Sequence, residues 1–93
     1  MVRITWAALA IEDLKNIYDY ILIDSKIYAD RIVEKIINRV DQLSLFPKSG
    51  RVVPEFENES IRELIEGNYR IIYKLTAHQI FIIRIHHSAR LMK

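Results

Sequence analysis

The last third of the chain decides the fold, and residues 61–93 read IRELIEGNYRIIYKLTAHQIFIIRIHHSARLMK. Runs rich in β-branched and aromatic residues are separated by Gly67-Asn68 and Ala77-His78, which predicts antiparallel strands joined by tight turns. The strands are expected at residues 61–66, 69–76 and 79–87, with a short helical turn at 88–93. Arg, Lys and His alternate with the apolar side chains. We therefore expect a small basic sheet that the rest of the chain supports.

Two amphipathic helices are expected upstream of this sheet. Residues 7–23 place apolar side chains on one helical stripe. That stripe comprises Ala10, Leu14, Ile17 and Ile21. Ser25 suits the N-cap of a second helix that runs to about Leu45, beyond which Pro47 stops it. Because the connection between the helices is very short, we expect an antiparallel helical hairpin.

A short strand and a long loop complete the order of elements. Residues 2–6 alternate in polarity and predict a strand ahead of the helices. Residues 47–60 contain Gly50 and Pro54 and predict a loop. Its acidic residues, expected on a solvated edge, are Glu55, Glu57 and Glu59. The chain thus reads as one α+β domain over residues 1–93, in the order β-α-α-β-β-β, with the helical hairpin packed on one face of a small, mostly antiparallel sheet.

The composition bounds the class of protein. A chain of 93 residues with 51% hydrophobic content can bury a core without covalent staples. It contains no cysteine, which excludes disulfides and thiolate metal sites and favours a reducing cytoplasm. No apolar run approaches the length of a membrane span, and the N-terminus does not read as a signal peptide. We expect a cytoplasmic protein without a cofactor and without a membrane partner.

Charge is unevenly distributed along the chain, whose formal net charge is +2. Residues 1–60 carry eight Lys and Arg against ten acidic residues, whereas residues 61–93 carry six against two. A basic final third beside an acidic remainder suggests a surface for nucleic acid or for an acidic protein. The alternative is scattered, solvated charge without a partner, and on charge alone the two interpretations stand equal.

Strand alternation indicates which face the basic side chains occupy. The more apolar sets should face the helices, namely Tyr69, Ile71, Tyr73 and Leu75, and Phe81, Ile83, Ile85 and His87. The opposite, uncovered face then collects four basic residues, Arg70, Lys74, Arg84 and His86. Ile72 and Ile82 would lie between them. We expect this cluster as a whole to bind a target, whereas for any single arginine local pairing is favoured, for example of Arg70 with Glu63. The face of Arg62 stays unassigned.

The two adjacent histidines do not form a metal site. Neighbouring residues in a strand point to opposite faces, so His86 and His87 cannot chelate one ion. His86 could act as a general acid or base beside Arg70 and Arg84. The sequence shows neither a Ser/His/Asp constellation nor a Gly-rich phosphate loop. We therefore expect no metal.

Several motifs in combination resemble a known family. They are Trp6, Ala10, Asp13-Leu14, Ile17, Tyr20-Ile21, Gly50-Arg51, Pro54-Glu55, Ile61-Arg62-Glu63-Leu64, Tyr69-Arg70-Ile71-Ile72-Tyr73, and His87 with Arg90. This pattern covers almost the whole chain and is similar to the RelE/ParE superfamily of toxins from type II toxin–antitoxin modules, also called plasmid stabilisation proteins. The resemblance implies the family fold, which has the same β-α-α-β-β-β order.

The superfamily contains two biochemical classes. RelE-like members enter the ribosomal A site and cleave mRNA, whereas ParE-like members poison DNA gyrase. If the chain is RelE-like, the implied catalytic residues are Arg70, Arg84, His86 and Arg90. The implied target-binding residues are Arg62, Arg70, Lys74, Arg84, His86 and Arg90.

The sequence departs from the RelE-like pattern in three places. Segment 61–64 replaces the second-strand lysines, Ser88 stands where an arginine follows the last strand, and a C-terminal Tyr is lacking. His87-Ser88-Ala89-Arg90 resembles the ParE-like His-Gly-Ala-Arg ending instead, which favours gyrase poisoning over mRNA cleavage. An interaction module without toxicity is a third alternative.

The resemblance also implies a protein partner. The family's antitoxin is a small protein whose acidic, amphipathic C-terminal segment wraps the toxin. We expect it to contact the helical hairpin, to cover part of the basic sheet, and to form a hetero-oligomer with this chain.

Overall fold

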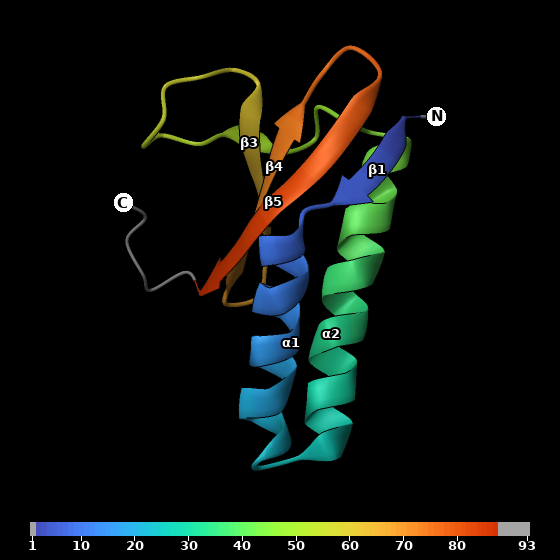
Figure 1. The fold of residues 1–93 in the computed structure, drawn as a ribbon, viewed down its shortest axis with the longest axis vertical. Coiled ribbons are helices and arrows are strands. Elements are labelled where there is room, and N and C mark those ends of the chain that lie inside the picture. Colours follow the sequence, from blue (N-terminus) through green and yellow to red (C-terminus); the bar gives the residue numbers. More distant parts are fainter. Residues whose placement is uncertain (1, 88–93) are drawn as a thin grey trace.

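The computed structural model describes residues 2–87, and the helical turn expected at 88–93 lies outside them. Two helices, α1 (Ala8–Leu22) and α2 (Lys26–Asp41), are followed by a short 3-10 helix, η1 (Gln42–Ser44). Figure 1 shows α1 and α2 running antiparallel along the long axis, with the tip of the hairpin projecting beyond the sheet. The predicted helical hairpin is confirmed.

The sheet has five strands in the order β1-β5-β4-β3-β2. They are β1 (Arg3–Trp6), β2 (Arg51–Val52), β3 (Ile61–Glu66), β4 (Tyr69–Leu75) and β5 (Gln79–His87). β1 runs parallel to β5 and the other neighbours are antiparallel, so the predicted α+β class and mostly antiparallel sheet are confirmed. The predicted loop over residues 47–60 was wrong at β2, because two residues are too few to form a sequence pattern.

Capping explains where the helices begin and end. The Ser25 hydroxyl accepts a hydrogen bond from the amide of Tyr28 at 3.1 Å, as predicted for an N-cap. The second helix was expected to run to Leu45, but α2 ends at Asp41 and tightens into η1. Such a 3-10 turn satisfies carbonyl groups that the end of an α-helix leaves without partners.

The core lies between the helices and one face of the sheet. Its buried residues are Ala10, Ile36, Val40, Leu43, Leu64, Ile71, Tyr73, Ile80, Ile82 and Ile85. Leu14 and Ile17 of the predicted stripe on α1 pack against this cluster. Six of these ten residues therefore come from β3, β4 and β5, the three strands that the C-terminal third supplies.

A β-bulge changes the alternation of β5. The register shift falls between Ile72 and Tyr73 of β4 and leaves Ile83 as the extra residue of β5. Alternation reverses across the bulge, so Ile82 is buried in the core and Phe81 shares the face of the basic residues. The prediction that put Ile82 among the cations and Phe81 against the helices was wrong, because strict alternation does not continue through a bulge.

Candidate functional site

The four basic residues expected on one face do share it. Arg70 is paired with His86, and Ile72 with Arg84, while Lys74 follows the alternation of β4. However, this face is not uncovered, because Arg70 is buried and Ile72 is only 1% exposed. The expectation of an open cationic surface was therefore wrong at Arg70. The segment between η1 and β3 supplies the groups that cover it.

Arg70 is the centre of a buried ion-pair network. Its Nε donates to Oε1 of Glu63 at 2.6 Å, and the Glu63 side chain is 0% exposed. Its two terminal nitrogens donate to the two carboxylate oxygens of Glu55 at 2.9 and 3.0 Å. The Nε of Arg51 binds the remaining oxygen of Glu63. Two arginines and two glutamates thus neutralise one another and tie the segment before β3 to β4.

The protonation equilibria follow from this pairing. Hydrogen bonds from Arg70 lower the pKa of Glu55 below its ordinary value. Hydrogen bonds to Glu55 raise the pKa of Arg70, and burial opposes that rise without reversing it. The alternative prediction, that Arg70 pairs with Glu63, is confirmed. Glu55 was expected on a solvated edge, but it is a ligand of Arg70.

Arg84 is held by helix α1. Its Nε and NH2 donate to the two carboxylate oxygens of Asp13 at 2.8 and 3.1 Å. The same carboxylate accepts from the amide of Ile85 at 2.9 Å, on the part of β5 that β1 does not pair with. Burial raises the pKa of Asp13, but the hydrogen bonds from Arg84 and Ile85 outweigh it and leave this pKa below its ordinary value. The charge of Arg84 is therefore neutralised within the chain.

The remaining predicted site residues lie in different settings. Lys74 is exposed and makes no ion pair with the part of the chain that the structure describes. His86 is half-buried on the same face. His87 lies on the other face, with its ring edge-on to Tyr69 at 5.5 Å between centroids, which confirms that the two histidines diverge. Arg90 lies outside the described residues.

Arg62 and Tyr73 hold the same segment in place from the helix side of the sheet. The two are paired in register, which assigns Arg62 to the side of the helices. Arg62 donates to the carbonyls of Gly50 at 2.9 Å and Glu59 at 3.1 Å. The hydroxyl of Tyr73 accepts from the Gly50 amide at 3.0 Å and donates to the Pro47 carbonyl at 2.8 Å. Arg62 is thus engaged with backbone and does not project freely to a target.

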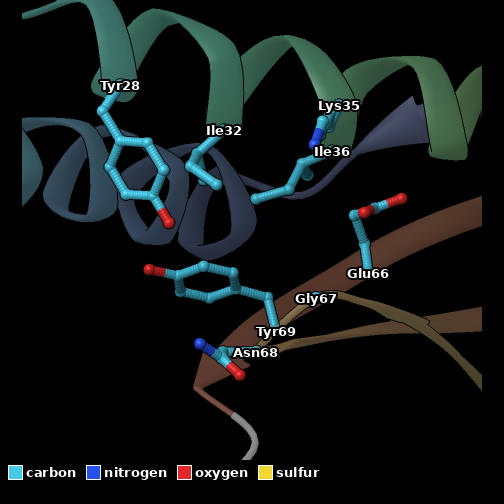
Figure 2. A pocket seen from close by; sticks show the side chains of 8 residues that line it. All are labelled: Tyr28, Ile32, Lys35, Ile36, Glu66, Gly67, Asn68 and Tyr69. Carbon is cyan, nitrogen blue, oxygen red and sulfur yellow. The ribbon is translucent and has the colours of Figure 1, made fainter.

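A pocket of about 210 Å³ opens on the helix side of the sheet, between α2 and the β3–β4 turn. It is lined by Tyr28, Ile32, Lys35, Ile36, Glu66, Gly67, Asn68 and Tyr69. Figure 2 shows the tyrosines extending from opposite walls, Tyr28 from α2 and Tyr69 from β4. Sequence reasoning did not identify this pocket, because its walls come from elements far apart in the chain.

Residues 2–87 contain no group of three or more His, Cys, Asp or Glu side chains that could hold a metal ion. None of their helices is both long enough and apolar enough to cross a membrane.

Sequence reasoning also missed the acidic partners of the arginines. Asp13 forms an ion pair with Arg84 and Glu55 forms one with Arg70, yet neither acid was a candidate site residue. Both belong to motifs on which the family resemblance rests, Asp13-Leu14 and Pro54-Glu55. That shared membership was the available signal that these acids act together with the basic strands.

Comparison with known proteins agrees with this geometry. The family model described as the ParE toxin of the type II toxin–antitoxin system parDE matches residues 4–92. Toxin RelE2 of Caulobacter vibrioides is 33% identical over 92 residues, which cover 98% of this chain and all of that protein.

Solved structures show the same fold. A chain of the chromosomal ParDE system from P. aeruginosa aligns with a TM-score of 0.77 and 27% identity, over 94% of this chain and 96% of that one. A chain of the RelBE2 toxin–antitoxin complex from Mycobacterium tuberculosis aligns with a TM-score of 0.70 and 19% identity, over 92% and 96%. The family and fold that the sequence motifs implied are confirmed. The chain belongs to the ParE toxin family of type II toxin–antitoxin systems, within the RelE/ParE superfamily.

Proposed function

We propose that this toxin inhibits growth by poisoning DNA gyrase, that it does so by binding rather than by catalysis, and that a cognate antitoxin neutralises it. The observation that carries the proposal is the internal pairing of Arg70 and Arg84. The match to the ParE family model over residues 4–92 supports the choice of target.

The ion pairs that Arg70 and Arg84 form within the chain argue against ribonuclease activity. Cleavage of RNA by its 2′-hydroxyl requires a base, an acid and cations that stabilise the charge developing on the phosphorane. Glu55 and Glu63 already neutralise Arg70 in a buried site, and Asp13 neutralises Arg84. Guanidinium groups compensated in this way have little capacity left for a phosphorane. A binding surface does not require that capacity.

The proposal divides the predicted target-binding residues into two groups. Lys74, Arg84 and His86 share one face, and Arg90 follows β5 in sequence; these four would contact the target. Arg62 and Arg70 would support that surface by holding the segment before β3. Substitution of Lys74, which is exposed, should change target affinity without changing stability, whereas substitution of Arg84 would also break its ion pair with Asp13.

A gyrase assay with purified protein tests the proposal. We expect loss of DNA supercoiling and accumulation of gyrase–DNA cleavage complexes as the toxin concentration rises. Lys74→Glu should weaken both effects, whereas Lys15→Glu, the same charge reversal on exposed α1, should not. Uninhibited supercoiling without trapped breaks would reject gyrase as the target.

A RelE-like mRNA endonuclease is the second candidate function. It is favoured by the 33% identity to Toxin RelE2 and by the cross-strand pairing of Arg70 with His86. Primer extension on translated mRNA would then show codon-phased cuts that disappear in His86→Gln. Intact transcripts during growth arrest would exclude this candidate.

The antitoxin and the compartment follow from the same proposal. We expect a short reading frame beside this one to encode an acidic protein that forms a hetero-oligomer with the toxin, as in the toxin–antitoxin complexes to which the fold is similar. Gyrase and ribosomes are cytoplasmic, so the toxin would act there. Unchanged growth after induced expression would instead favour an interaction module without toxicity.

A further inference from the structure

We propose that the pocket between α2 and the β3–β4 turn anchors one large apolar side chain from an acidic, amphipathic segment of the antitoxin. This inference rests on the proposed antitoxin partner and identifies where on the helical hairpin it would be held. Three observations carry it: the size and walls of the pocket, the charges on its rim, and the exposed apolar residues beside it.

The size of the pocket favours a side chain over a small-molecule ligand. Its volume of about 210 Å³ falls below the roughly 300–1,000 Å³ of small-molecule sites. Ile32 and Ile36 provide an apolar wall on α2, and Tyr28 and Tyr69 approach from opposite sides (Figure 2). Aromatic side chains arranged in this way favour an inserted aliphatic or aromatic group.

Two tyrosines, Tyr28 and Tyr69, line the pocket. Burial raises the pKa of Tyr69, and the nearby hydroxyls of Tyr28 and Tyr20 raise it further. Tyr28 belongs to α2 and Tyr69 to β4, so the pocket joins a helix to the sheet. Tyrosine is enriched at protein interfaces because it combines an apolar ring with a polar tip.

The charge on the rim favours an acidic partner. Lys35 lines the pocket, and Arg31 and Arg39 lie one helical turn away on either side of it. Arg31 and Lys35 are exposed and form no ion pair with any residue in the described range 2–87. Among the residues that the structure describes, Glu66 is the single acidic residue of the lining. Three cations in a row on α2 therefore complement carboxylates that flank an apolar anchor.

Exposed apolar residues extend the surface toward the tip of the hairpin. Ile23 is 81% exposed and Ile27 is 75% exposed, as is Tyr20. Figure 1 shows that this tip projects beyond the sheet, which leaves it accessible from several sides. These residues lie at the end of α1, in the connection and at the start of α2, and exposed apolar surface of this kind marks interaction sites. An amphipathic segment is the occupant that matches both this patch and the basic row.

The absence of cysteine in the sequence permits a direct test by thiol protection. Lys35→Cys places a single thiol at the rim of the pocket, and Lys15→Cys places a matched thiol on exposed α1. The probe is the full-length protein encoded beside the toxin, and the measurement is the rate of maleimide labelling with and without it. We expect saturating antitoxin to slow labelling of Lys35→Cys at least tenfold and to change Lys15→Cys less than twofold.

The outcomes separate failure of the anchor site from failure of the antitoxin proposal. If the adjacent protein binds the toxin but leaves Lys35→Cys fully reactive, the anchor site is wrong and the antitoxin proposal stands. If it does not bind the wild-type toxin, the antitoxin proposal itself fails, and the anchor site fails with it. Protection that grows with toxin concentration alone would assign the pocket to a second copy of the chain and would also overturn the inference.

Substitutions supply an independent measurement by titration calorimetry. Tyr28→Ala should weaken antitoxin binding at least tenfold, because a pocket wall is lost. The control is Phe46→Ala, which removes another exposed aromatic side chain that does not line the pocket, and it should leave binding unchanged. Lys35→Glu should weaken binding about threefold to tenfold and reduce its salt dependence. Near-wild-type affinity for both pocket variants, with unchanged melting temperatures, would refute the anchor.

Discussion

The two faces of the β-sheet are buried by different means. On the helix side, apolar side chains such as Ile71 and Ile85 pack against α1 and α2. On the opposite side, Glu63 and Arg70 are buried in an ion-pair network with the segment that precedes β3. The difference teaches that basic residues on strands can be paired within the chain and are then not available to bind a ligand. In this toxin, the central arginine fastens a segment of the chain to the sheet.

The largest expected effect is on the charged face. Arg70→Met should destabilise the fold by about 3–5 kcal/mol, because it leaves the buried Glu63 carboxylate with only Arg51 as a charged partner. Chemical denaturation measures the change.

The matched control is the double variant Arg70→Met with Glu63→Leu. It should recover most of that loss, since replacing a buried pair by apolar groups is often neutral or stabilising. If the double variant is as unstable as Arg70→Met alone, the ion pair between Arg70 and Glu63 is not what makes Arg70 important for stability.

A cavity on the helix side should cost about as much or slightly less. Ile71→Ala removes a fully buried side chain and should lower the free energy of unfolding by about 2–5 kcal/mol. Ile65→Ala, on the exposed part of β3, is the control and should cost less than about 1 kcal/mol. Equal losses at the two positions would contradict the assignment of the core to one face.

The two glycines should differ in their tolerance of alanine. A Cβ at Gly50 would lie 2.6 Å from the Glu63 carbonyl and from the Tyr73 hydroxyl, so Gly50→Ala should cost about 1–3 kcal/mol and loosen the segment before β3. Gly67→Ala meets no atom within 4 Å, and only its positive φ of 58° opposes it. Hydrogen exchange at Arg51 and Val52 should rise in Gly50→Ala alone. The same rise in both variants would argue against close packing at Gly50.

The smallest expected effect concerns pH. Folding lowers the pKa values of Asp13 and Glu55, so below about pH 4 the unfolded chain binds more protons than the folded chain. The free energy of unfolding therefore decreases as the pH is lowered through this range. Asp13→Asn should cost about 1 kcal/mol at neutral pH, since Arg84 is partly exposed, and should make the acid-dependent loss shallower. Melting curves between pH 7 and pH 2 measure both. An unchanged pH profile would show that Asp13 is not coupled to folding.

Regular patterns in the sequence were sufficient for most of the fold. The helical hairpin, the N-cap at Ser25 and the bounds of β3 and β5 follow from local periodicity and turn residues, which depend on near neighbours in the chain. The bulge at Ile83 did not follow, because one unpaired residue leaves no mark on the pattern. β2 was equally hidden, since its pairing depends on contacts with β3.

The candidate site was only partly accessible to sequence reasoning. Alternation placed Arg70 and Arg84 on one face, but their partners come from distant segments, Glu55 before β3 and Asp13 on α1. Pairing across such separations is a tertiary property that strand alternation cannot encode. The pocket beside Tyr28 and Tyr69 was missed for the same reason.

The most direct test of the central claim is gyrase-dependent DNA cleavage by the double variant Arg70→Met with Glu63→Leu. If Arg70 is a structural fastening and the toxin acts by binding, the folded double variant should trap cleavage complexes at close to the wild-type level. A folded, stable double variant that traps none, while the wild type does, would contradict the claim and place Arg70 in direct contact with the target.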